Sequence, residues 1–150
     1  MGLLDRLGGD SRTVALLVDG PNVFRSEFDV DLDELRAIAG ERGRVAVARC
    51  YLDTNASAGL IQAAEARGFE VVVTSGDVDV RLAIDATELA CDGDVDVLAI
   101  ASRDADFKPV VEAAHRRGLR TVAIAPGEYG RSSALANAVD EAVVLVQKTA

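Results

Sequence analysis

The stretch LAIASRDADFKPVV, from Leu98 to Val111, joins an apolar strand pattern directly to a helix pattern. Its first residues are almost continuously apolar, which is typical of a strand buried on both faces of a parallel sheet. Two aspartates, Asp104 and Asp106, stand at the join, and Pro109 fits the first turn of the helix that follows. A buried strand that leads straight into a helix indicates an α/β domain. The two like charges at the junction need a separate explanation.

The alternation of strand and helix patterns recurs along the whole chain. The helical segments begin with acidic residues or a serine cap and stop at glycines, namely Ser57 as the cap and Gly40 or Gly43, Gly68 and Gly118 as the stops. The apolar, β-rich runs between them are VALLV (14–18), VAVARC (45–50), EVVVT (70–74), VDVLAIA (95–101), TVAIA (121–125) and AVVLV (142–146). We therefore predict a three-layer, Rossmann-like α/β domain with a central, mainly parallel β-sheet.

Length and composition limit the possible classes of protein. A chain of 150 residues predicts one domain, which we place at residues 13–150 after a short, flexible leader at residues 1–12. No apolar run approaches the roughly 18 residues of a membrane-spanning helix, and the leader lacks the pattern of a signal peptide. We therefore expect a cytoplasmic protein with no membrane partner. The cysteines, Cys50 and Cys91, stand in apolar surroundings with neither paired spacing nor an adjacent histidine, so we expect two buried thiols in place of a zinc site or a disulfide.

The charge balance weighs against a broad nucleic-acid-binding surface. The formal net charge is −9 at pH 7, and such a chain repels phosphate backbones at long range. Any function that involves a phosphate therefore needs a local source of positive charge.

Acidic residues follow two of the predicted strands at the point where each ends. Asp19 follows the first strand, with Asn22 close behind it, and Asp104 and Asp106 follow the fourth. Ligand sites in parallel α/β sheets lie beyond the carboxyl ends of the strands, at the switch in strand order. If these two strands are neighbours, their carboxylates share one crevice.

A third acidic contribution comes from the helical segment SGDVDVRLAIDATELA. Helical geometry puts Asp79 on the apolar stripe that faces the sheet. Asp85, six positions on, lies about 120° around the axis on a more polar face with Arg81. A salt bridge to Arg81 is a sufficient explanation for Asp85.

A crevice that holds four aspartates is unstable unless protons or cations neutralise it. Oxygen ligands without histidine or cysteine favour Mg²⁺ or Mn²⁺, which would also recruit a phosphate despite the acidic surface. The four residues are Asp19, Asp79, Asp104 and Asp106. For any single aspartate after a strand, a turn or helix cap is the alternative, and Asp106 before FKPVV fits a cap.

Three segments, LLVDGPNVF, GDVDVRLAIDATELA and AIASRDADFKPVV, together resemble the NYN domain family, a branch of the PIN-like nuclease superfamily. The resemblance covers roughly residues 13–147. It implies a PIN-like fold and a ribonuclease that depends on Mg²⁺ or Mn²⁺. The positions that match the family's functional residues are Asp19, Asn22, Asp79, Asp104 and Asp106, with Asp85 as a second-tier ligand that helical geometry disfavours.

The resemblance and the chemistry together predict hydrolysis of RNA phosphodiester bonds. We expect Asp19 and Asp104 to be direct metal ligands, and Asp79 and Asp106 to complete the site directly or through water. Asn22 would hold Asp19 or the attacking water in place.

Substrate contacts are a weaker expectation. Ser102 either binds the substrate or merely ends its strand, and each nearby cation either contacts phosphate or is a solvated surface charge. The cations are Arg103, Lys108, Arg25 and Arg131. Two tyrosines, Tyr51 and Tyr129, are candidates for stacking on unpaired bases.

Other classes of protein remain as alternatives. One is a catalytically silent NYN-type regulatory module that binds RNA or a protein partner. A receiver domain expects a lysine after the last central strand, where TVAIAPGEYG has none, and a Toprim domain expects a glutamate in place of Asp19. A dinucleotide-binding domain needs a glycine-rich turn that DGPNVF lacks. A homo-oligomer is a further expectation, because the leader segment GLLDRL is apolar.

Overall fold

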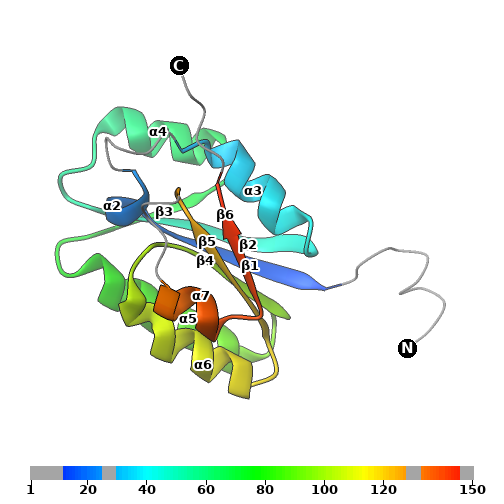
Figure 1. The fold of residues 1–150 in the computed structure, drawn as a ribbon. Helices are drawn as coiled ribbons and strands as arrows, with labels where there is room; N and C mark the ends of the chain where they lie inside the picture. The colour runs from blue at the N-terminus through cyan, green and yellow to red at the C-terminus, as the bar shows by residue number, and fades with distance from the viewer. Residues whose placement is uncertain (1–11, 25–29, 128–132, 146–150) are drawn as a thin grey trace.

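The fold is described from a computed structural model, for residues 12–24, 30–127 and 133–145. Six strands form one sheet in the order β3-β2-β1-β4-β5-β6, and every neighbouring pair is parallel (Figure 1). The strands are β1 (Thr13–Asp19), β2 (Arg44–Asp53), β3 (Glu70–Thr74), β4 (Val97–Ala101), β5 (Arg120–Ala125) and β6 (Glu141–Val144). The predicted α/β class is confirmed, and the predicted mainly parallel sheet is parallel throughout these strands.

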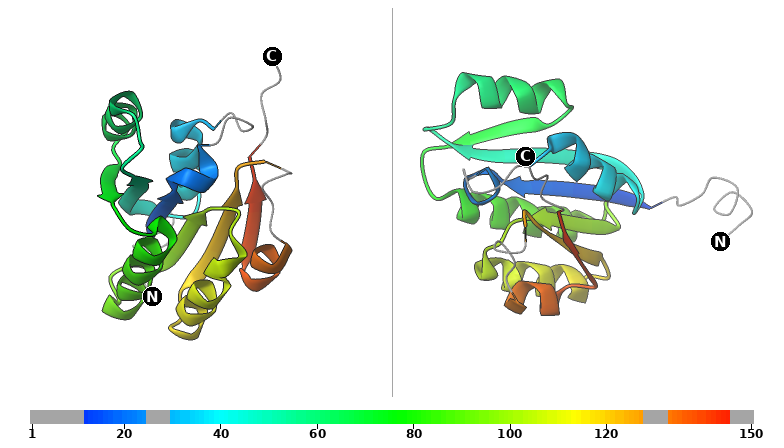
Figure 2. Two further views of the ribbon diagram at one scale, coloured as in Figure 1. Left: turned by 90° about the vertical axis from the view of Figure 1, so that its left-hand side faces the viewer. Right: turned by 45° about the horizontal axis from the view of Figure 1, so that its top comes forward.

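Helices cover both faces of the sheet, which gives the predicted three layers (Figure 2). One face carries α2 (Gly20–Val23), α3 (Leu32–Gly40) and α4 (Ala58–Ala66). The other carries α5 (Val78–Asp92), the short 3-10 helix η1 (Ala105–Phe107), α6 (Lys108–Arg116) and α7 (Ser133–Ala138). Alternate β1 residues enter the two cores, with Leu16 in one and Leu17 in the other, and both are fully buried. Burial on both faces explains the continuously apolar strand sequences.

The order of the strands reverses between β1 and β4. From β1 the chain builds outward through β2 to β3, and from β4 it builds outward through β5 to β6. Val18 of β1 is in register with Ala101 of β4, so Asp19 and Ser102 continue the two strands at the same level. The fold therefore places the ends of these strands side by side at its switch point, where α/β sheets bind ligands.

The amino edge of the sheet is closed by two similar threonine–aspartate pairs. The backbone N–H of Thr13 donates to Asp96 at 2.8 Å, and the backbone N–H of Thr121 donates to Asp140 at 2.8 Å. Each threonine hydroxyl also donates to the same carboxylate oxygen. In each pair the aspartate directly precedes a neighbouring strand, so these bonds satisfy backbone groups that a strand end leaves unpaired.

The helix signals in the sequence act as expected. Ser57 caps α4 by accepting a hydrogen bond from the backbone N–H of Leu60 at 3.1 Å, and α3 ends at Gly40. Gly118 follows α6 with a φ of 89°, a left-handed conformation that favours glycine.

Some expectations fail or lie outside the described residues. Cys50 is buried, but Cys91 is exposed, because it lies on the side of α5 that faces away from the sheet; the prediction of a buried thiol is wrong there. Among the described residues, no helix is both long and apolar enough to span a bilayer. The leader segment GLLDRL falls outside the described residues.

Candidate metal centre

Three carboxylates converge at the switch point of the sheet. Oxygen atoms of Asp79, Asp104 and Asp106 all lie within 4.8 Å of one another. Asp79 stands in the first turn of α5, while Asp104 and Asp106 belong to the turn that carries β4 into η1. Two segments on the same face of the sheet thus bring together three of the aspartates that the sequence singled out.

The turn after β4 orients its two aspartates through a backbone hydrogen bond. Oδ1 of Asp104 accepts from the backbone N–H of Asp106 at 2.8 Å, which makes Asp104 the cap of η1. The capping role considered for Asp106 therefore belongs to Asp104. The capping bond uses one oxygen of Asp104 and accounts for the turn. It does not account for the carboxylate of Asp106 beside it.

Asp19 is the buried acid of the site, with only 1% of its surface exposed. Its Oδ2 accepts hydrogen bonds from the side-chain amide of Asn22 at 2.5 Å and from the hydroxyl of Ser102 at 3.0 Å. Burial raises the pKa of the Asp19 carboxyl above its ordinary value of 3.8; the two hydrogen bonds lower it, and the charges of Asp104 and Asp79 raise it again. Asp19 thus lies close enough to the other carboxylates to interact with their charge, although it is outside the tight group of three.

Ser102 connects the two halves of the site. Its hydroxyl donates to Asp19 and accepts from the backbone N–H of Asp104 at 3.0 Å, and only 1% of the residue is exposed. A hydroxyl that is buried and used in this way positions two acidic residues and does not reach a substrate. The sequence suggested substrate contact or a simple strand end for Ser102, and neither role includes the one its hydrogen bonds indicate, which is to position Asp19 and the turn at Asp104.

Gly20 allows the chain to turn into the site directly after β1. A Cβ atom at this position would lie 2.4 Å from the carbonyl oxygen of Tyr51 and 2.4 Å from a side-chain carbon of Leu52. Only a residue without a side chain fits so close to β2, and Pro21 then fixes the first turn of α2. This local packing brings Asn22 within reach of Asp19.

An open cleft of about 280 Å³ lies in front of these groups. Two of the aspartates that line it, Asp53 and Asp77, were not identified from the sequence. Asp53 ends β2 next to β1, and its Oδ1 accepts from the backbone N–H of Asn55 at 2.9 Å. The position of Asp53 at the end of a central strand is a signal that could have revealed it. The full lining is Asp19, Pro21, Asn22, Asp53, Gly76, Asp77, Val78, Asp79 and Asp104.

Asp85 stands apart from the tight group of three. Its Oδ2 accepts from the hydroxyl of Tyr51 at 2.7 Å, and Arg81 lies 3.3 Å away in the expected i, i+4 pair. Arg49 is 3.8 Å from the same carboxylate. These partners support the helical-geometry interpretation of Asp85 over its resemblance to a second-tier ligand.

Tyr51 is fully buried, so it cannot stack on a base and that expectation is wrong. Burial and the hydrogen bond to Asp85 raise the pKa of the Tyr51 hydroxyl above its ordinary value. Lys108 is exposed at the start of α6, and Arg103 is half-buried between Ser102 and Asp104. The other candidates for substrate contact, Arg25, Arg131 and Tyr129, lie outside the described residues.

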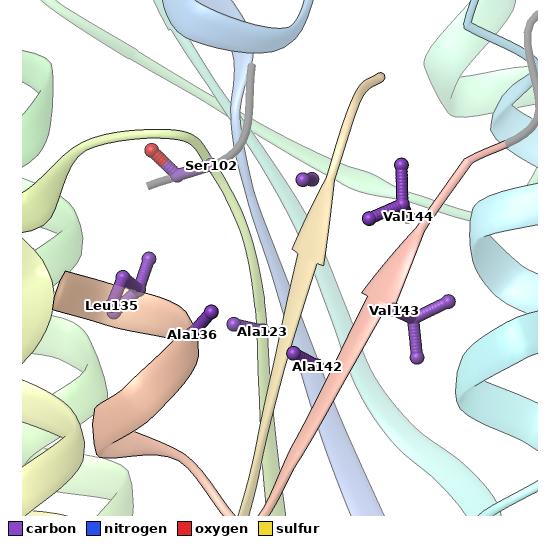
Figure 3. Close-up of a pocket in the computed structure, with 8 residues that line it drawn as sticks. Ser102, Ala123, Leu135, Ala136, Ala142, Val143 and Val144 are labelled. Carbon is purple, nitrogen blue, oxygen red and sulfur yellow. The ribbon is translucent and has the colours of Figure 1, made fainter. Parts of the chain in front are cut away.

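A second, smaller cavity lies between α7 and strands β5 and β6 (Figure 3). Its walls are mainly aliphatic, with Leu135 and Ala136 on one side and Val143 and Val144 on the other, and Ser102 at its margin. The space open to the centre of a water molecule is about 10 Å³, enough for about one water. A cavity of this size and lining is a packing defect with no room for a substrate.

The donors in the acidic cleft suit a hard divalent cation. They are carboxylate oxygens, the ligands that Mg²⁺ and Mn²⁺ prefer. Oxygens of Asp79 and Asp104 in the cleft lie within 4.8 Å of each other and of Asp106 next to it. The site is thus an acidic cleft at the switch point of a parallel α/β sheet, and its oxygen donors define it as a candidate divalent-cation site.

The chain belongs to the NYN domain family, which matches residues 13–146. The predicted resemblance is therefore confirmed. The chain is 45% identical over 127 residues to the uncharacterized protein MJ0482 of Methanocaldococcus jannaschii, an alignment that covers 85% of this chain and 52% of the relative. The chain thus spans about half the length of that relative.

A solved structure shares the fold. The protein of unknown function VPA0982 from Vibrio parahaemolyticus superimposes with a TM-score of 0.78, over 91% of this chain and 94% of that one. Sequence identity is 24%, so this similarity supports the fold alone.

Proposed function

We propose that this protein is a metal-dependent ribonuclease that hydrolyses RNA phosphodiester bonds in its acidic cleft. The observation that carries the proposal is the convergence of Asp79, Asp104 and Asp106 within 4.8 Å at the switch point of the sheet. Membership of the NYN domain family supports the same class of activity.

The residues divide into holding and positioning roles. Asp79, Asp104 and Asp106 would hold Mg²⁺ or Mn²⁺, with Asp19 contributing negative charge from the buried side. When bound, the cation would lower the pKa of a coordinated water and offset charge on the phosphate. Asn22 and Ser102 hold the Asp19 carboxylate in one orientation. The capping bond from the backbone N–H of Asp106 to Asp104 fixes the turn that presents both side chains.

The acidic surface limits how the RNA would be bound. A net charge of −9 disfavours wide contact with the phosphate backbone. We therefore propose that the protein binds only a few phosphates of its RNA substrate, and that the cation and residues such as Lys108 supply the positive charge. Activity on short or single-stranded RNA should consequently depend strongly on the divalent cation and less steeply on monovalent salt.

The test combines Mn²⁺ binding by calorimetry with cleavage of a mixed pool of single-stranded and structured RNA. The test variant is Asp104→Asn, and the matched control is Asp31→Asn. Asp31 caps α3 by accepting from the backbone N–H of Asp33 at 2.8 Å, which is the same local bond that Asp104 makes. We expect binding and cleavage in the wild type and the control, and loss of both in Asp104→Asn.

Two results would contradict parts of the proposal. Mn²⁺ binding without cleavage of any RNA would replace the nuclease by a regulatory NYN-type module that binds RNA or a protein. Absence of Mn²⁺ binding to the wild type would leave Asp104 as a helix cap and remove the metal centre.

A further inference from the structure

Helix α5 is apolar on two opposite sides. Leu82, Ala86 and Ala90 are buried against the sheet. On the far side, Val80 is 52% exposed and Ile84 is 50% exposed, which makes them two of the large apolar side chains most open to solvent in the described chain. An apolar side that stays exposed on a folded domain is a candidate for contact with another molecule.

The exposed side of α5 has the spacing of a helix-pairing seam. Val80, Ile84, Thr87 and Cys91 recur at intervals of four, three and four residues, and all four are exposed. This is the alternation with which one helix packs against another along a coiled-coil seam. We refer to these four residues as the α5 seam.

We propose that the α5 seam binds the α5 seam of a second copy of this chain, with the two helices antiparallel. Charges beside the seam are complementary to those of a second copy in this orientation. Arg81 and Glu88 lie one helical position beyond Val80 and Thr87, on the same flank of the seam. In an antiparallel pair, the flank that carries Arg81 and Glu88 on one helix lies against the same flank of the other helix. Arg81 of each chain then faces Glu88 of the other, and the twofold symmetry produces two such contacts. In a parallel pair the same flank meets the opposite flank, which carries Ala83 and Ala90, and these charges find no complement.

The antiparallel arrangement also fixes which seam residues meet. Val80 of one chain faces Cys91 of the other, and Ile84 faces Thr87. The acidic clefts stand at the amino ends of the two α5 helices, so they lie at opposite ends of the pair and both stay open. Dimer formation is therefore independent of metal binding and of nuclease activity.

The interface is expected to be weak. One 15-residue helix on each side buries less than the roughly 1,600 Å² of a standard stable interface. The dimer should therefore dissociate on dilution.

A disulfide test reads the orientation directly. We expect Val80→Cys to form a covalent dimer through the native Cys91 of the second copy, on a non-reducing gel under mild oxidation. Positions 80 and 91 of one helix are about 16 Å apart, beyond disulfide reach, so the bond cannot form within a chain. Two matched controls should stay monomeric on the same gel: the wild type, which keeps the exposed Cys91 without a cysteine at position 80, and Val80→Cys with Cys91→Ser. No cross-link in Val80→Cys, or one that persists in the double variant, would overturn the antiparallel pair.

Sedimentation velocity over a dilution series tests the interface without cross-linking. We expect the wild type to shift between monomer and dimer, and Ile84→Glu to weaken association by at least about tenfold. Val73→Glu is the matched control, because Val73 is 47% exposed but lies on β3, outside the seam. Circular dichroism checks that both variants are folded. A wild type that stays monomeric at millimolar concentration, or Val73→Glu weakening association as much as Ile84→Glu, would refute the proposal.

Discussion

Replacing Asp104 by asparagine should make the metal-free protein more stable. Asp104 shares the tight group with Asp79 and Asp106, and its charge also acts on Asp19. Without a cation, these carboxylates repel one another in the folded state and are far apart in the unfolded chain. Asparagine keeps the side-chain oxygen that caps η1, so the substitution removes charge and little else.

The size of the effect follows from the separation of the carboxylates. At the upper limit of 4.8 Å for these oxygen–oxygen separations, two unit charges repel by about 0.9 kcal/mol in a water-like medium and by about 3.5 kcal/mol at an effective dielectric constant of about 20. Neutralising Asp104 relieves two such pairs. Because Asp104 and Asp79 are half-exposed and Asp106 is exposed, the lower figure applies. We expect the free energy of unfolding to rise by about 1 to 2 kcal/mol.

The assay is urea unfolding at low ionic strength, in the presence of EDTA and then of Mn²⁺. In EDTA, Asp104→Asn should exceed the wild type in stability, and added salt should shrink the difference because it screens the repulsion. In Mn²⁺ the order should reverse, since the cation stabilises only a folded state that binds it. Asp31→Asn, which neutralises a cap of the same geometry, reports the effect of the same substitution at a site outside the acidic cleft.

An Asp104→Asn variant that is no more stable in EDTA than Asp31→Asn would contradict repulsion among the carboxylates as the source of the effect. Such a result would mean that the carboxylates do not repel in the folded protein, either because a proton is shared among them or because they separate without a cation. Either outcome would remove the electrostatic basis for a metal centre at this cleft.

Two further predictions concern carboxylates outside the tight group. Asp85→Asn should lower the free energy of unfolding by about 1 to 3 kcal/mol, because Asp85 accepts a hydrogen bond from the buried Tyr51 and pairs with Arg81. Calorimetry should show that its Mn²⁺ affinity stays within about twofold of the wild type. A larger loss of affinity would make Asp85 a metal ligand. For Asp140, hydrogen bonds from Thr121 lower the pKa below its ordinary value of 3.8, so its stabilisation is present above that pH and is lost as the pH falls through the lowered folded-state pKa. Urea titrations should therefore show Asp140→Asn less stable than the wild type at neutral pH, with the gap closing below about pH 4; a constant gap would contradict this assignment.

The fold follows from local sequence patterns because burial direction is a local property. Continuously apolar strands report coverage on both faces, and the structure confirms helices on both sides of a parallel sheet. Helical periodicity also distinguished Asp79, which lies beside the acidic cleft, from Asp85, which lies with Tyr51 and Arg81. Both results depend only on the angle between neighbouring side chains on one element.

The remaining features depend on contacts between distant segments. The bond from Ser102 to Asp19 joins positions 83 apart in sequence, and nothing in the local pattern of either strand end encodes it. Tyr51 looked available for stacking, but its strand is central and its hydroxyl is held by Asp85. Cys91 looked buried because its neighbours are apolar, although α5 turns that side to solvent. Both errors concern the burial of a side chain. Burial depends on which side of its strand or helix the residue occupies, and the composition of the neighbouring sequence does not give that side.

The way Asp19 is held connects the stability of the site with its chemistry. A buried carboxylate is commonly stabilised by a cationic side chain, which would also cancel its charge. Here the donors to Asp19 that orient it are Asn22 and Ser102, both neutral, so the carboxylate is fixed in place and its negative charge remains. Replacing that arrangement by an ion pair would stabilise the metal-free fold and would also remove part of the attraction for a divalent cation. Neutral donors around a buried acid, beside three more carboxylates, leave a local excess of negative charge at the cleft, which is the charge that the proposed divalent cation would offset.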